Sequence, residues 1–81
     1  MKLPRNLSGL DLIKALKKYE YEIVRQKGSH IRLRTTLNGE HNITIPNHNP
    51  LKSGTLSAIL SAIAEHQEIT KEALIEALFE K

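Results

Sequence analysis

The chain of 81 residues contains no cysteine, no tryptophan, and only one phenylalanine and two tyrosines. Without cysteine, neither a disulfide bond nor a zinc site built on thiolates can form. Three aromatic side chains are too few for a surface on which several nucleic-acid bases stack in a row. The longest apolar stretch, residues 56–64, is broken by Ser57 and Ser61 and is too short to span a bilayer. These absences exclude disulfide-stapled, thiolate-zinc, base-stacking and membrane-spanning classes of protein.

The remaining composition is that of an ordinary globular domain. Hydrophobic residues make up 40% of the chain and charged residues 26%, and this length suffices for one hydrophobic core. We therefore expect a single domain over residues 1–81, with any chemistry on an open surface. The first residues lack the apolar run of a secretory signal. Together with the absence of cysteine, this predicts a cytoplasmic protein with no membrane partner.

Charge is distributed unevenly along the chain. Residues 1–34 contain nine Lys and Arg against three acidic residues, a net charge of +6, whereas residues 35–81 contain three against six, a net charge of −3. A basic half favours a polyanionic partner, because the positive field raises both encounter rate and affinity. A merely solvated charged surface is the alternative interpretation.

Helical patterns flank a central region of alternating residues. Ser8 and Asp11 have the spacing of a capping box, which predicts a first helix over residues 9–18. A second helix should begin near residues 53–55, and Thr70 should cap a third. The apolar positions of these helices recur at three- and four-residue spacing: Leu12, Ile13 and Leu16; Leu56, Ile59, Leu60 and Ile63; Leu74, Ile75, Leu78 and Phe79.

Between the first two helices, residues 21–27, residues 30–36 and a segment ending at Pro46 have the composition of strands. The order α-β-β-β-α-α predicts an α+β fold, in which the helices cover one face of an antiparallel sheet. For the second hairpin, a three-residue loop over residues 37–39 keeps Ile43 and Ile45 on the core face. The first hairpin, at Gly28-Ser29, is left open between two loop lengths.

A two-residue turn at Gly28-Ser29 pairs Lys27 with His30 and Arg25 with Arg32, but places Tyr21 and Ile23 on the polar face. A three-residue turn does the reverse. With either turn, the side chains that alternate with the apolar residues of the middle strand stay together on the face opposite the core. These side chains are His30, Arg32 and Arg34.

This combination of residue types suits the cleavage of RNA. The ribose 2′-hydroxyl is itself the nucleophile, so the protein must move protons and offset the charge that grows on the phosphate. Imidazole, with an unperturbed pKa of about 6.5, suits the first task, and fixed cations suit the second. We therefore predict His30 as the catalytic residue. The predicted RNA-binding residues are Arg25, Lys27, Gly28, Ser29, Arg32, Arg34 and Lys52.

The other three histidines are weaker candidates. His48, in a loop between prolines, is a candidate second proton donor, and turn formation is its alternative role. His41 is expected to be a solvated strand residue, and His66 to lie at the C-terminal end of the second helix. Their spacing matches no zinc motif, so we expect no metal and no cofactor.

The segment 25–30, Arg-Gln-Lys-Gly-Ser-His, resembles the Gly-Ser-His core of the HicA toxins, a family of bacterial mRNA interferases. The resemblance continues through residues 43–48 and 51–60. It implies a fold similar to a double-stranded-RNA-binding domain with a short extra C-terminal helix, and a catalytic histidine at His30. It also implies ribosome-independent cutting of mRNA, and a HicB-like antitoxin that covers the active site. The chain departs from the family at residues 31–32 and in a longer, more polar link over residues 65–70.

We therefore expect the toxin component of a toxin-antitoxin pair, a metal-independent endoribonuclease in which His30 performs general acid or base catalysis. A non-catalytic RNA-binding module of the same fold is the alternative. A DNA-binding regulator is disfavoured, because no helix pair has the short spacing and basic second helix of a helix-turn-helix.

Overall fold

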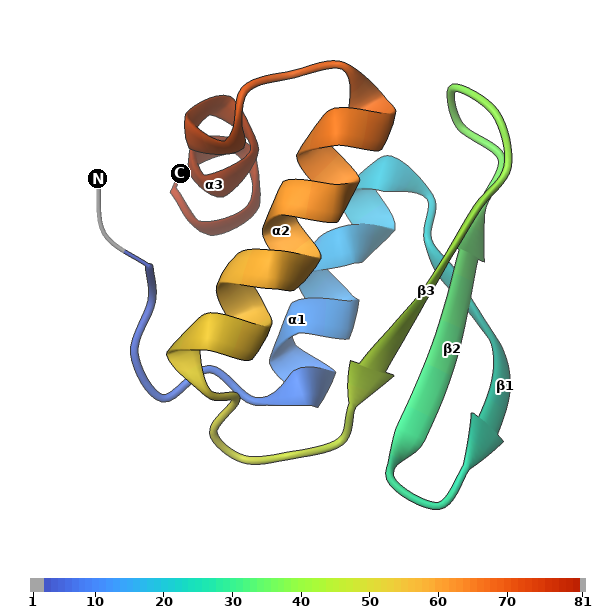
Figure 1. Ribbon diagram of the computed structural model, residues 1–81, viewed down its shortest axis with the longest axis vertical. Coiled ribbons are helices and arrows are strands. Elements are labelled where there is room, and N and C mark those ends of the chain that lie inside the picture. Colours follow the sequence, from blue (N-terminus) through green and yellow to red (C-terminus); the bar gives the residue numbers. More distant parts are fainter. Residues whose placement is uncertain (1–2, 81) are drawn as a thin grey trace.

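The computed structural model describes residues 3–80 and contains helices and strands in the predicted order (Figure 1). The elements are α1 (Gly9–Leu16), the 3-10 helix η1 (Lys17–Tyr19), β1 (Glu22–Lys27), β2 (His30–Thr35), β3 (His41–Pro46), α2 (Ser53–Gln67) and α3 (Lys71–Phe79). The strands form one antiparallel sheet in the order β1-β2-β3. The predicted α+β fold is confirmed: it is the α-β-β-β-α fold of double-stranded-RNA-binding domains with an extra C-terminal helix. Among the described residues, no helix is long and apolar enough to cross a membrane.

The first helix begins at the predicted capping box. The Asp11 N–H donates to the Ser8 hydroxyl at 3.0 Å, and the Ser8 N–H donates to the Asp11 carboxylate at 3.2 Å. The second of these bonds holds the pKa of Asp11 below its usual value. Helix α1 ends at Leu16, and Glu20, with a φ of 63°, turns the chain towards the sheet. Its apolar stripe, Leu12, Ile13 and Leu16, is buried.

The first hairpin has the two-residue turn. Lys27 pairs with His30 and Arg25 with Arg32, and Gly28 adopts a φ of 58°, which glycine reaches without steric cost. A bulge between Ile23 and Arg25 then shifts the register. This extra residue removes only part of the expected penalty of the short turn: Tyr21 returns to the core face and is fully buried, whereas Ile23 remains 53% exposed.

The second hairpin has the predicted register. Ile31 pairs with Ile45 and Leu33 with Ile43, so that odd-numbered residues pair with odd-numbered ones. Gly39 has the expected positive φ, 95°. The strands separate earlier than predicted, however, so the loop spans residues 36–40 instead of 37–39.

The core lies entirely on one side of the sheet, where α1 and α2 pack and α3 packs on them in turn (Figure 1). Gly9 shows how closely the layers approach: a Cβ atom at this position would lie 2.2 Å from the Pro46 carbonyl oxygen. The Gly9 N–H donates to the His48 carbonyl oxygen at 2.9 Å. The helical layer and the end of β3 are therefore in backbone contact.

The link before the last helix is shorter than the sequence suggested. The expected link of residues 65–70 is helical as far as Gln67, and only residues 68–70 connect α2 to α3. The reason lies in the last turn of α2, where the His66 and Gln67 side chains reach carbonyl oxygens of the β2–β3 loop. As predicted, Thr70 caps α3, accepting a hydrogen bond from the Ala73 N–H at 3.0 Å.

Candidate functional site

The candidate site lies on the sheet face that the helices leave uncovered. In β2 the burial alternates strictly, with every second residue buried. The inward residues are Ile31, Leu33 and Thr35, and the outward ones are His30, Arg32 and Arg34, as predicted. The inward residues form the core, and the outward side chains are exposed and available to bind a ligand.

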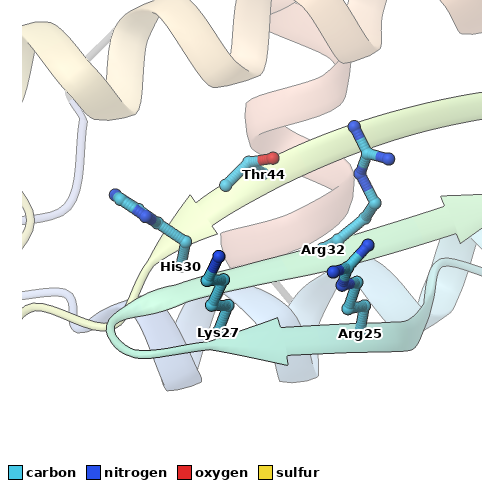
Figure 2. A pocket seen from close by; sticks show the side chains of 5 residues that line it. All are labelled: Arg25, Lys27, His30, Arg32 and Thr44. Atoms are coloured by element: carbon cyan, nitrogen blue, oxygen red, sulfur yellow. The ribbon is translucent and has the colours of Figure 1, made fainter.

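His30 opens into a shallow concavity of about 400 Å³ (Figure 2). The lining residues come from all three strands and are Arg25, Lys27, His30, Arg32 and Thr44. The register explains their proximity, since Lys27 lies opposite His30, and Arg25 and Thr44 lie on either side of Arg32. Successive rows are separated by about 6.6 Å along the strands. In Figure 2 the long side chains of Arg25, Lys27 and Arg32 rise from neighbouring strands on the same side of the sheet.

The electrostatics of the concavity favour an anion. Three of its five lining side chains, those of Arg25, Lys27 and Arg32, carry a positive charge, and none is acidic. Guanidinium groups present several N–H donors in a planar fork that matches phosphate oxygens. The site is open to solvent, so its attraction for a polyanion will depend strongly on salt. The chemistry that fits is binding of a phosphodiester chain beside an imidazole.

The predicted turn residues Gly28 and Ser29 adjoin the concavity and fix its end. The Asn47 N–H donates to the Ser29 carbonyl oxygen at 2.6 Å, which ties the loop after β3 to the hairpin. His48 follows directly, and its side chain is exposed. It is not among the residues that line the concavity. The structure therefore brings the backbones near His30 and His48 together without placing the His48 ring in the site.

Two of the predicted cations lie elsewhere. Arg34 is on the same face but one row farther along β2, opposite Glu22, in a hollow that also contains Glu20. Lys52 directly precedes α2 and lines a separate groove with Arg5. The structure therefore brings together His30, Arg25, Lys27 and Arg32 of the predicted set, and separates Arg34 and Lys52 from them.

Thr44 is the one lining residue that the sequence analysis did not single out. Its position followed from the alternation of β3, because Ile43 and Ile45 face the core and Thr44 must then face outward. Nothing about a lone threonine marks it as functional. The signal came only from its pairing with Arg32.

His41 is a strand residue, as expected, but the expectation that it is solvated is wrong, because its side chain is half-buried. The Tyr21 hydroxyl lies 2.6 Å from His41 Nδ1, and the His41 ring stacks on that of His66 with 4.4 Å between centroids. His66 Nε2 lies 2.9 Å from the Gly39 carbonyl oxygen, an acceptor, so it carries a proton. Burial, and then the neighbouring His66, lower the pKa of His41. These rings tie the β2–β3 loop to the end of α2.

The histidines therefore do not converge on one point. His30 and His41 lie at opposite ends of the β2–β3 pair, since His30 pairs with Pro46 and His41 with Thr35. That is a separation of about 16 Å along the strands. Among residues 3–80, no group of three or more histidine or acidic side chains is arranged to hold a metal ion.

The chain matches a known protein family. The model of the HicA toxin of bacterial toxin-antitoxin systems matches residues 9–64, more than half of the chain. The matched range includes the sheet and its concavity and ends before the last turn of α2 and before α3. Comparison with the curated proteins and with the solved structures finds no match. On the strength of the family match, the chain belongs to the HicA toxin family of bacterial toxin-antitoxin systems.

Proposed function

We propose that this protein is an endoribonuclease that cuts mRNA without the ribosome, with His30 transferring protons at the scissile phosphate. HicA toxins are mRNA interferases, and membership of the family implies an RNA target and a partner antitoxin. The observation that carries the proposal is the position of His30, in a concavity that it shares with three cations and no acidic side chain. The proposal treats residues 1–81 as one HicA-like domain acting in the cytoplasm.

The proposed reaction uses a nucleophile that the substrate provides. The 2′-oxygen forms a bond to phosphorus while the bond from phosphorus to the 5′-oxygen breaks, leaving a 2′,3′-cyclic phosphate. His30 accepts the proton of the 2′-hydroxyl or supplies one to the 5′-oxygen. Arg25, Lys27 and Arg32 offset the charge that develops on the phosphate oxygens. His48 remains the candidate for the second proton transfer, which would require its exposed side chain to turn towards bound RNA.

The open face also suits inhibition by a partner. We propose that a HicB-like antitoxin covers the concavity, because a site this shallow can be blocked without any change in the fold. Its surface should present acidic side chains to the three cations, as complementary charge gives fast and specific association.

The product ends test the nucleophile. We expect the 5′ fragment to end in a 2′,3′-cyclic phosphate or the derived 3′-phosphate. A substrate with one 2′-deoxyribose at the cut site should bind nearly as well and resist cleavage, and EDTA should leave the rate unchanged. Cleavage of the deoxy-substituted strand, or loss of activity in EDTA, would instead indicate a metal-bound hydroxide.

Replacement of His30 tests the catalytic residue. His30→Ala should abolish cleavage and keep RNA binding, and its unfolding free energy should stay within about 0.5 kcal/mol of wild type, because the side chain is exposed. The adjacent Ile31→Ala is the matched control. Ile31 is 1% exposed, so this change should cost about 2–5 kcal/mol. If His30→Ala unfolds the protein, His30 is structural and the proposal is wrong.

One observation favours the alternative of a non-catalytic RNA-binding module. Among the residues that line the concavity, only His30 is of a type that exchanges protons readily near neutral pH. A binding module would hold RNA through the same cations without turnover. The cleavage assay separates the two functions. If the protein is only a binding module, wild type and His30→Ala will bind RNA alike and neither will cut it.

A further inference from the structure

Thr44 lines the concavity from the edge strand β3, where it lies directly opposite Arg32 in the β2–β3 pair. Figure 2 shows its side chain on the same side of the sheet as His30 and Arg32. The residue is exposed, and its neighbours Ile43 and Ile45 point the other way. Its hydroxyl therefore faces whatever occupies the concavity.

A second threonine in the sheet provides a contrast. Thr35 faces inward on β2 and is 1% exposed. Its hydroxyl donates to the Tyr19 carbonyl oxygen at 2.8 Å and accepts from the Leu37 N–H at 3.0 Å. Thr35 is thus committed to the fold. Thr44, on the outer face, makes no side-chain hydrogen bond to any other residue within 3–80.

The chemistry of Thr44 differs from that of its neighbours. Guanidinium and ammonium groups only donate hydrogen bonds, so Arg25, Lys27 and Arg32 recognise negative oxygens and cannot accept a hydrogen bond from a neutral hydroxyl. The threonine hydroxyl both donates and accepts. The ribose 2′-hydroxyl has the same dual character, and it is the group that distinguishes RNA from DNA.

We propose that Thr44 is a specificity-determining residue that binds a ribose 2′-hydroxyl next to the scissile phosphate. The inference rests on the proposed function, which places that phosphate at His30. Thr44 lies one row away, because His30 pairs with Pro46 and Arg32 with Thr44, a distance of about 6.6 Å along the strand. The sugar bound by Thr44 therefore belongs to a flanking nucleotide, not to the one whose 2′-hydroxyl attacks.

The test is a scan of single 2′-deoxy substitutions in the His30→Ala protein, which should bind RNA without cutting it. Affinity for a short fluorescent RNA is measured by anisotropy, with one 2′-deoxyribose at each position in turn. We expect one flanking position to weaken binding about two- to tenfold, the range of one net hydrogen bond. Thr44→Val, which has nearly the same shape, is then added to His30→Ala. It should weaken the binding of all-ribose RNA by the same factor, and the 2′-deoxy substitution at that position should then cause no further loss. Thr44→Ser in place of Thr44→Val should restore both the affinity and the penalty of the 2′-deoxy substitution.

Each outcome supports or overturns the proposal. If Thr44→Val keeps the full deoxy penalty at every position, or if the lost penalty belongs to the attacked nucleotide, the role of Thr44 is wrong. If the His30→Ala protein does not bind RNA, the role of Thr44 and the RNA-binding face fail together. If wild type binds RNA and never cuts it, the nuclease function fails alone, because the deoxy penalty and its loss in Thr44→Val are measured by binding and need no cleavage.

Discussion

At the residue scale, Arg32 and Arg34 form a matched pair, since both are exposed arginines on the same face of β2. Only Arg32 lines the concavity, whereas Arg34 lies opposite Glu22. We expect Arg32→Ala to weaken RNA binding, to reduce the slope of log affinity against log salt by about 0.7, and to lower the cleavage rate at saturating RNA. Arg34→Ala should leave that rate within about twofold of wild type. Affinity is measured across a salt series, and cleavage under single-turnover conditions.

Because both variants lose one positive charge, a difference between them cannot arise from net charge alone. Equal losses of cleavage rate would show that the face acts as a diffuse field. They would then contradict the assignment of the site to the concavity.

At the scale of secondary-structure elements, the contact between α1 and β3 depends on Gly9. A Cβ atom there would lie 2.2 Å from the Pro46 carbonyl oxygen, so Gly9→Ala must displace backbone and should cost about 1–3 kcal/mol of unfolding free energy. Gly54→Ala is the control, because nothing lies within 4 Å of a Cβ at this position in α2 and alanine favours the helix by up to about 1 kcal/mol. Urea unfolding of both variants measures the effect. A neutral Gly9→Ala would contradict the close packing of helix and strand.

The contact between the β2–β3 loop and α2 should make stability depend on pH. Burial and His66 lower the pKa of His41 below the ordinary histidine value of 6.5, so at mildly acidic pH the unfolded chain binds a proton there that the folded chain does not. The contribution of neutral His41 to stability is fully present above the unfolded pKa of 6.5. It is lost progressively as the pH falls from there towards the lower pKa of the folded state.

We therefore expect the urea midpoint of wild type to fall between pH 7.5 and pH 5, and His41→Asn to show a smaller fall. The asparagine amide can still pair with the Tyr21 hydroxyl and does not titrate in this range. Thr44→Val serves as the control, because it removes no titratable group, and it should keep the wild-type pH dependence. If His41→Asn loses stability on acidification as steeply as wild type, another group is responsible.

The helices and strands could be predicted from the sequence where one local pattern determines the structure. The capping box at Ser8, the cap at Thr70 and the alternation of β2 each depend on neighbouring residues alone. The features that the sequence analysis missed depend on contacts between distant segments. The bulge at Val24 relieves a conflict of register across a hairpin, and the role of His41 depends on α2, 25 residues farther along the chain. The same reasoning placed His30 and Arg32 on the outer face of the sheet but did not single out Thr44, whose position beside Arg32 depends on the pairing of two strands.

At the scale of the whole molecule, the open face of the sheet and the C-terminal helical segment, residues 65–80, carry opposite charge. The open face carries Arg25, Lys27 and Arg32, whereas five of the nine acidic residues occur in residues 65–80. We expect RNA to slow amide hydrogen exchange in the β1–β2 hairpin and in β3, and to leave α3 unaffected. A HicB-like antitoxin added to the complex should displace the RNA. Protection of α3 by RNA, or simultaneous binding of RNA and antitoxin, would place the interface elsewhere.

The strict alternation of β2 has a consequence for how this protein can change. Two independent instructions are interleaved in six residues: the odd positions specify the fold, and the even positions specify what the surface meets. A substitution at an even position changes the contacts with a ligand and leaves the packing of the core intact. Single substitutions at these even positions can therefore change which target or inhibitor the protein binds without changing its fold.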